Sequence, residues 1–171
     1  MTDATENGGE LPQGDTRLLE TEVAQRLLAS TTPARVAYVA RDGTPRVVPS
    51  WFHWTGDELV MPTYIRAPHI SRPAHRLAAL RANPAVAVTI DTDVEPPDVL
   101  LLRGRVTITE VEGVVPEYAI EARRRLPGEA ADQLLGMVGQ PGATTMARIA
   151  LRPTWVGVLD FRSRMPSVIT G

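Results

Sequence analysis

The residues of this sequence that could do chemistry are three histidines and a set of clustered arginines. The chain has no cysteine, so disulfides, thiolate metal sites and cysteine nucleophiles are excluded. The spacing of His53, His69 and His75 does not place imidazoles together on one helix face, so no metal site is predicted. The motifs Gly-x-Ser-x-Gly and Gly-x-Gly-x-x-Gly are both missing, so neither a serine hydrolase nor a Rossmann dinucleotide site is predicted.

A basic cluster follows the third expected strand, and it consists of Arg66, Arg72, His75, Arg76 and Arg81. These residues span a loop and the first turns of an expected helix. A helix N-terminus presents free N–H groups and a partial positive charge, so added guanidinium groups there would favour an anion. Two interpretations remain open at this point: an anion site, or a solvated helix face.

Two further clusters have simpler interpretations. Arg123, Arg124 and Arg125 form a basic run close to the end of an expected helix, where cations are favourable, and we interpret the run as a solvated helix end. Residues 51–54 (Trp-Phe-His-Trp) are dense in aromatic rings. Core packing explains such a run, and the alternative is a platform for a flat ring system. Alternation along a strand places Trp51 and His53 on one face, so at most half of the run can line one pocket.

The hydrophobic pattern predicts the elements that position these residues. After Asp15 or Thr16 as N-cap, leucine and valine recur at helical spacing until Pro33 stops the helix. Asp42-Gly43 indicates a hairpin, and Pro49 confines the return strand to a sheet edge or a bulge. Strands are predicted over 35–40, 46–54, 58–61, 86–90, 99–102, 106–108, 147–151 and 155–161, and helices over 73–81, 116–125 and 129–138. The strands do not alternate regularly with helices, which favours an antiparallel barrel over a parallel α/β sheet.

The composition is that of an ordinary globular domain. Of 171 residues, 43% are hydrophobic and 22% charged, and the formal net charge is −2, so no attraction to nucleic acid or to an anionic membrane is expected. Residues 1–14 are polar and aperiodic, and we expect a disordered tail before a single domain over 15–171. No secretion signal is visible and no apolar run reaches the length of a membrane span, so a cytoplasmic location is expected.

Three segments, in this order, resemble the pyridoxamine-phosphate-oxidase-like split-barrel proteins. The first is the run from Ala34 to Phe52, with a strand, Asp-Gly, Pro and a hydrophobic strand that contains proline. The second is the stretch 73–84, a helix that ends in Leu-x-x-Asn-Pro before the strand Val-Ala-Val. The third is Leu102-Arg-Gly-Arg-Val106, which is similar to a glycine-containing barrel strand of that family. The resemblance covers roughly residues 27–161.

The resemblance implies a mainly β (α+β) fold, a six-stranded antiparallel split β-barrel with peripheral helices. It also implies a homodimer with a cofactor between the subunits, either flavin mononucleotide (FMN), which is slightly favoured, or the deazaflavin coenzyme F-420. The family's phosphate-binding basic residue, usually Lys, falls on Arg76, and a guanidinium also serves an anion well. The cofactor-binding residues implied by the resemblance and the basic cluster are Val48, Pro49, Ser50 and Trp51 at the ring, Thr63 at the tail, Ser71, Arg72, His75 and Arg76 at the phosphate, and Trp155 at the site shared between subunits.

The implied function is that of an oxidoreductase acting on a small organic substrate. In such enzymes the cofactor ring carries the hydride chemistry, so no catalytic side chain is assigned. Pyridoxamine-phosphate oxidase activity itself is disfavoured, because Thr154-Trp155-Val156 stands where that branch has Trp-Arg-x-x-Arg. The alternatives are a non-catalytic protein that carries a flavin, haem or bilin, and an enzyme relic without cofactor.

Overall fold

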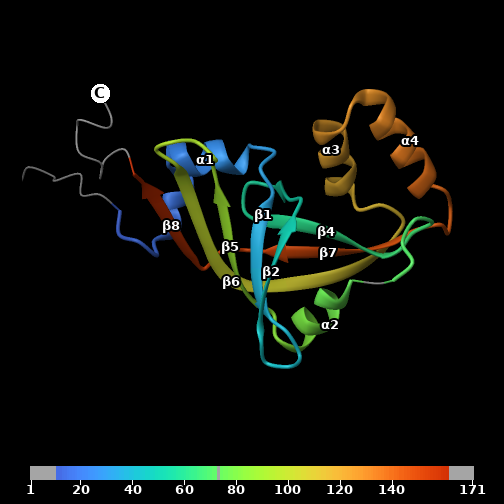
Figure 1. Cartoon of the computed structure of the whole chain (residues 1–171), viewed down its shortest axis with the longest axis horizontal. Helices are drawn as coiled ribbons and strands as arrows, with labels where there is room; N and C mark the ends of the chain where they lie inside the picture. Colours follow the sequence, from blue (N-terminus) through green and yellow to red (C-terminus); the bar gives the residue numbers. More distant parts are fainter. Residues whose placement is uncertain (1–10, 73, 162–171) are drawn as a thin grey trace, which may run out of the picture.

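The computed structural model describes residues 11–72 and 74–161, and its strands form a single antiparallel sheet (Figure 1). The strand order is β2-β1-β5-β6-β7-β4-β3, and β8 pairs with β6 outside this path. The strands are β1 (Ala34–Val39), β2 (Pro45–Ser50), β3 (His53–Trp54), β4 (Leu59–Arg66), β5 (Ala85–Asp91), β6 (Asp98–Glu112), β7 (Thr145–Leu151) and β8 (Trp155–Asp160). No ladder among the described residues joins β2 to β3, so the barrel is split. The predicted mainly β split-barrel architecture is confirmed, with eight strands because β3 and β8 extend the sheet.

The long strand β6 connects the two halves of the barrel. Its first part pairs with β5 and β8, and its second part, from Val106 onward, pairs with β7. Gly104 lies at the changeover, where a Cβ atom would be 2.9 Å from Leu151 Cδ1 and 3.0 Å from the carbonyl oxygen of Arg152. The sequence predicted two strands here, but only glycine permits this close approach, and the chain continues as one strand.

The hairpin between β1 and β2 forms where the sequence predicted it. Gly43 has φ +80°, which glycine adopts without strain, and the Asp42 carboxylate accepts a hydrogen bond from the Thr44 backbone N–H at 3.0 Å. The return strand is shorter than predicted, because the segment 46–54 divides into β2 and β3. β2 is an end strand of the order, so the edge position predicted from Pro49 is confirmed.

The first helical segment is two elements rather than the single predicted helix. A 3-10 helix (Thr16–Glu20) with Asp15 as N-cap is followed by α1 (Glu22–Leu28). Thr21 separates them, because its backbone is extended and its side chain caps α1 by accepting a bond from the Ala24 N–H. A threonine N-cap satisfies a backbone donor that the start of a helix leaves free.

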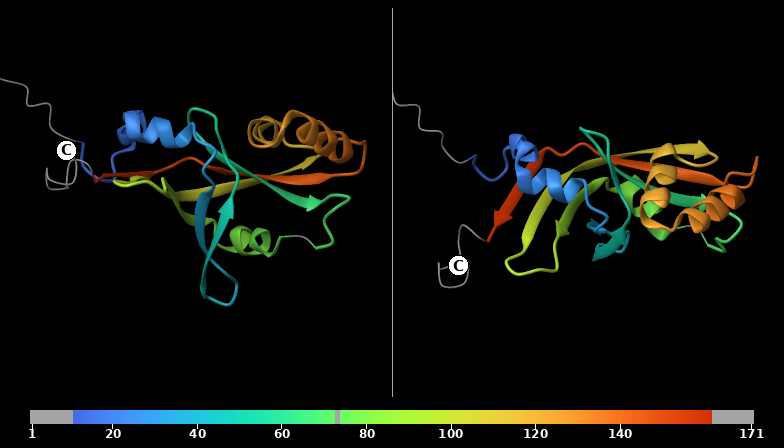
Figure 2. Two further views of the ribbon diagram at one scale, coloured as in Figure 1. Left: turned by 45° about the horizontal axis from the view of Figure 1, so that its top comes forward. Right: turned by 90° about the horizontal axis from the view of Figure 1, so that it is seen from above.

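The remaining helices agree with the prediction within two residues. They are α2 (His75–Ala82), α3 (Pro116–Arg125) and α4 (Gly128–Val138). Both figures of the whole chain show α1, α3 and α4 on one side of the sheet and α2 on the other (Figures 1 and 2). None of the helices in the described part of the chain is long and apolar enough to cross a membrane.

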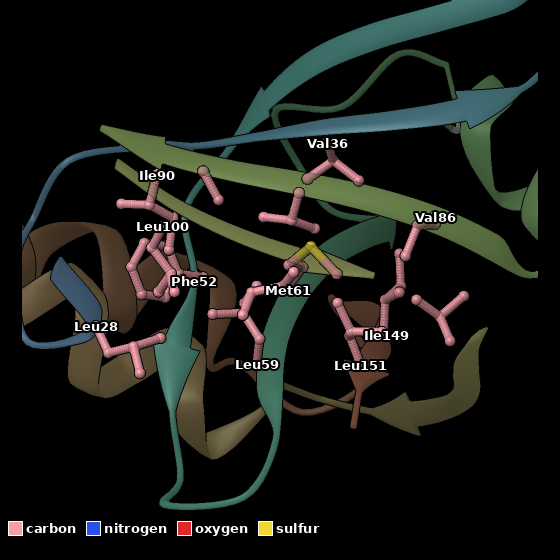
Figure 3. Close-up of a cluster of buried hydrophobic side chains, with 14 of the residues drawn as sticks. Leu28, Val36, Phe52, Leu59, Met61, Val86, Ile90, Leu100, Ile149 and Leu151 are labelled. Carbon is pink, nitrogen blue, oxygen red and sulfur yellow. The ribbon is translucent and has the colours of Figure 1, made fainter. Parts of the chain in front are cut away.

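The main core fills the inside of the split barrel. Figure 3 shows Leu28 of α1, Phe52, Met61 of β4, Ile90 of β5 and Ile149 of β7 within this cluster. A second, smaller cluster lies under α3 and contains Val115, Tyr118, Ala122 and Met146. β7 is buried along nearly all of its length, with Ala147, Ile149 and Leu151 in the main core and Met146 in the second cluster.

The domain begins before the expected boundary at residue 15. Residues 1–10 of the predicted tail lie outside the described residues. Gln13 and Gly14, however, hydrogen-bond to β8: the Gln13 amide donates to the Val158 carbonyl at 2.8 Å and accepts from the Val158 N–H at 3.0 Å. The Gly14 N–H donates to the Val156 carbonyl at 2.7 Å. The structure therefore places the end of the predicted tail on the domain.

Candidate functional site

The start of α2 brings the predicted phosphate residue to the mouth of the barrel. Leu77 and Leu80 are buried against the core, and this fixes the orientation of the helix. The N-cap is Ala74, which offers no side-chain hydrogen bond to the first turn. The N–H groups and the positive dipole end of this turn are therefore not screened by a capping side chain.

Arg76 extends from this turn into the barrel, and its charge has no acidic partner among the described residues. One terminal nitrogen, Nη2, donates to the hydroxyl of Thr63 on β4. Nε is buried and makes no hydrogen bond, and no salt bridge to Arg76 is found within residues 11–72 and 74–161. Burial lowers the pKa of Arg76 below its ordinary value, although a guanidinium stays charged at neutral pH. A buried cation of this kind needs an anion to offset its desolvation.

One space adjoins this guanidinium group and another lies nearby, and Tyr38 of β1 lines both of them. The first, beside Arg76 itself, holds only about 10 Å³ between Met61, Leu80, Ile149 and their neighbours. The second is a pocket of about 490 Å³ between the β1–β2 hairpin and α2, where the charged lining residues are Arg41, Asp42, Arg46 and His75. Tyr38 and Arg46 were not predicted as site residues. The sequence did carry a signal for them: Tyr38 is two residues from Val36 and Arg46 is two residues from Val48, so all four lie on the inner face of the hairpin.

The predicted ring-binding segment divides between the inside and the outside of the sheet. Val48 packs against the main core and Ser50 is buried, whereas Pro49 is exposed. Trp51 follows β2 and stacks on Tyr118 of α3, with ring centroids 6.0 Å apart. The alternation of the aromatic run is confirmed, because Trp51 and His53 contact α3 whereas Phe52 and Trp54 pack with the main core.

The other predicted residues do not all gather around Arg76. Thr63 lies in the middle of β4 rather than at a strand end, because β4 continues to Arg66, and it contacts Arg76 directly. Ser71 and Arg72 are exposed in the loop before α2. Trp155 lies on β8, where the Arg103 guanidinium stacks on its ring at 3.9 Å, so one chain does not bring it to Arg76.

The basic cluster as a whole is dispersed rather than focused on one ligand. Arg66 donates to the Gly142 carbonyl and to Thr145, and Arg81 pairs with Glu110. Of the five basic residues, Arg72, His75 and Arg76 therefore remain as candidates, in the loop before α2 and at its start. The exposed helix-face interpretation fits Arg81, whereas the anion-site interpretation of Arg76 stays a prediction.

The second basic run corrects the interpretation of residues 123–125 as a solvated helix end. The side chain of Arg125 is only 6% exposed, and its Nε donates to Glu121 at 3.0 Å. Arg124 donates to the same carboxylate at 2.6 Å. Only Arg123 keeps the exposed, unpaired position expected of a helix end, as judged within the described residues. A buried acid one turn earlier on α3 explains the difference.

A family model described as pyridoxamine 5'-phosphate oxidase matches residues 20–159. The chain belongs to this family. The match extends from the end of the first helical turn to β8, so it includes Arg76, Thr63 and the whole sheet. No match is found among the curated protein sequences.

Solved structures support the pyridoxamine 5'-phosphate oxidase fold. An F420 reductase is 23% identical, with a TM-score of 0.54 over 78% of this chain and 94% of that one. A conserved hypothetical protein from Mycobacterium tuberculosis is 15% identical, with a TM-score of 0.60 over 92% and 94%. A pyridoxamine 5'-phosphate oxidase-related, FMN-binding protein from Nostoc punctiforme is 14% identical, with a TM-score of 0.52 over 80% and 78%. At these identities the likeness is one of fold.

Proposed function

We propose that this protein binds a phosphate-bearing flavin or deazaflavin, FMN or coenzyme F-420, and acts as an oxidoreductase on a small organic substrate. The observation that carries the proposal is Arg76, a buried guanidinium group with an unpaired Nε and no acidic partner in the described chain. Membership of the pyridoxamine 5'-phosphate oxidase family supports it. The names of two structural neighbours, an F420 reductase and an FMN-binding protein, agree with either cofactor.

The residues at the barrel mouth fit the phosphate end of such a cofactor. Arg76 would supply the charge, and Thr63 and the uncapped N-terminal end of α2 would add to the site. The space beside Arg76 is too small for a phosphate, whereas the pocket across Tyr38 is about 490 Å³. A turn of the Tyr38 ring would join the two, so the proposal requires Tyr38 to move when the phosphate binds.

When bound, the cofactor ring would supply the hydride chemistry, and the chain would bind, orient and exclude water. Val48 and Ser50, on the inner face of β2, would border the cofactor ring. Because the ring would carry the chemistry, the site needs no acid–base pair of side chains. The same binding residues would equally suit a carrier protein. Turnover with a reductant and an acceptor separates the oxidoreductase from a carrier, which would bind without turnover.

We also propose that the protein works as a homodimer. The outer face of the sheet formed by β2, β1, β5 and β6 has a shallow concavity of about 590 Å³ whose lining includes Ala37, Val47, Ala87, Val99 and Phe161. Val47 is 64% exposed there, and the ion pair between Arg35 and Asp91 adjoins this apolar area. An apolar centre beside a charged rim is typical of a protein interface.

The phosphate assignment is tested by titrating FMN and coenzyme F-420 into the wild type, Arg76→Ala and Arg81→Ala by calorimetry. A charge-assisted bond to phosphate contributes about 1.5–3 kcal/mol, so Arg76→Ala should weaken binding by roughly tenfold to a hundredfold. Arg81 is the matched control, because it sits on the same helix in an exposed ion pair with Glu110. Equal affinities of the wild type and Arg76→Ala for whichever cofactor binds would overturn the assignment.

A further inference from the structure

A second pocket lies on the other side of the sheet from Arg76, between α1, β3 and α3. It has a volume of about 290 Å³, and its lining residues are Gln25, Leu28, Ala29, His53, Trp54 and Arg124. Figures 1 and 2 show α1 and α3 on the side of the sheet opposite to α2, so this pocket is separate from the proposed phosphate site. Its volume is just below the range of pockets that hold drug-sized ligands, which indicates a smaller occupant.

A buried carboxylate organises the polar wall of this pocket. The side chain of Glu121 is 1% exposed, and three basic groups surround it. His53 Nδ1 is 3.0 Å away, Arg124 Nη1 2.6 Å and Arg125 Nε 3.0 Å. A carboxylate with several charge-assisted donors holds each donor in a fixed orientation.

The charges of this cluster do not cancel. Arg124 and Arg125 share the single carboxylate of Glu121, and within the described residues no second acidic side chain forms a salt bridge with either. The nearby acid Glu117 is engaged by Arg148 at 2.8 Å. The cluster therefore carries one net positive charge with His53 neutral, and the side chain of Arg124, which is 36% exposed, brings that charge to the pocket.

Arg124 is held ready for a ligand, and His53 is fixed beside it. Arg124 is anchored twice, by Glu121 and by the Ala29 carbonyl at 2.5 Å, which leaves three of its five N–H donors. Nδ1 of His53 donates to the Glu121 carboxylate, and this contact fixes the imidazole ring as part of the pocket wall. Groups held in place before binding lose little conformational entropy when the ligand arrives.

Apart from Gln25, the rest of the wall is apolar. Leu28 and Ala29 come from the end of α1, and Trp54 supplies a flat indole surface. An inorganic anion would leave these surfaces in contact with water, whereas a ligand with a hydrocarbon body would cover them. The pocket thus combines a fixed cationic wall with an apolar one.

We propose that this pocket binds a small organic carboxylate with a flat apolar body. Its carboxylate accepts hydrogen bonds from Arg124, and its body packs on Trp54 and Leu28. The site does not depend on the proposed cofactor, since none of its lining residues is shared with the spaces around Arg76. Its occupant is an additional ligand of the protein, either a substrate or an effector.

The test uses benzoate as the probe and benzamide, a neutral molecule of the same shape, as its control. Calorimetry on the full chain should detect benzoate binding and at least tenfold weaker binding of benzamide, because only the charged group gains from the cationic wall. Inorganic phosphate should bind at least tenfold more weakly than benzoate. Absence of benzoate binding at about 10 mM, or equal binding of benzamide or phosphate, would overturn the proposal.

Substitutions locate the site. Arg124→Gln should weaken benzoate binding by about tenfold, whereas Arg123→Gln, the same change at the exposed neighbour on α3, should leave it unchanged. Arg76→Met should also leave it unchanged, and a loss in that variant would place the benzoate at the barrel mouth instead. If Arg124→Gln does not fold, the NMR signal of the Trp54 indole N–H in the wild type tests the site instead. The signal is assigned by its loss in Trp54→Phe. It should shift on adding benzoate, and an unchanged signal would show that the pocket is not the site.

Discussion

Two buried arginines of this protein differ in one respect, the presence of an acidic partner. Arg76 is buried beside Thr63 without a carboxylate, whereas Arg125 is buried on Glu121. Removing an unpaired buried charge removes the free-energy cost of its desolvation. Removing one partner of a buried ion pair, in contrast, leaves the other charge buried without compensation. The two residues are therefore expected to respond to the same substitution with opposite signs.

Arg76→Met should raise the free energy of unfolding of the cofactor-free protein by about 1 kcal/mol, because methionine fills the space without a charge. Arg125→Met should lower it by about 2 kcal/mol or more, since Glu121 loses a donor. Urea denaturation of both variants measures the difference. A marked loss of stability in Arg76→Met would mean that the guanidinium group is a structural support rather than a site held for an anion.

The sequence allowed some of these residue roles to be predicted and not others. Arg76 was singled out by the family resemblance, counted back from Asn83-Pro84, and by its place at the start of a helix, and both signals are local in the sequence. The spacing of Glu121 to Arg124 and Arg125 is also local, and it matches the helical i, i+3 and i, i+4 pairs. The burial of these residues is not local. It results from the packing of α3 on Trp51 and Tyr64, which are distant in the chain, so the run was interpreted as exposed.

At the scale of elements, turns and helices with strong local signals were predicted well. The Asp42-Gly43 hairpin and the helices α3 and α4 lie where the pattern placed them. The misplaced boundaries depend on pairing between distant segments. β4 is longer than predicted because β7 pairs with it up to Arg66, and β6 is continuous because three different strands pair with its two parts.

The segment before the first helical turn is the element whose contribution is most easily measured. The Gln13 amide exchanges two hydrogen bonds with Val158 and so extends the pairing of β8. Gln13→Ala should therefore lower the free energy of unfolding by roughly 1 kcal/mol, as judged by urea denaturation. Gln133→Ala is the control, because that exposed glutamine bonds only to Glu129 on its own helix, among the described residues. An unchanged stability of Gln13→Ala would show that the segment adds nothing to the domain.

At the scale of the whole molecule, the outer face of β2, β1, β5 and β6 is the surface proposed to meet a second copy. Helices cover other parts of the sheet, and the apolar groups of Val47, Ala87 and Val99 line a concavity on this face. A symmetric dimer uses the same patch twice, so one substitution changes both sides of the interface. Trp155 is distant from Arg76 within one chain. In the proposed dimer, Trp155 of one copy could contribute to the site of the other.

Val47→Glu tests this arrangement. Val47 is 64% exposed in the single chain, so the substitution should leave the fold intact. In a symmetric dimer it would bury two unpaired carboxylates, each costing several kcal/mol, so the dimer dissociation constant should rise at least about a hundredfold. Light scattering at micromolar concentration should show a dimer for the wild type and a monomer for Val47→Glu. Ile120→Glu, an equally radical change at a residue of α3 that is 44% exposed, should remain dimeric. If Ile120→Glu dissociates and Val47→Glu does not, the interface lies on α3, and if the wild type is monomeric with cofactor bound, the dimer proposal is wrong.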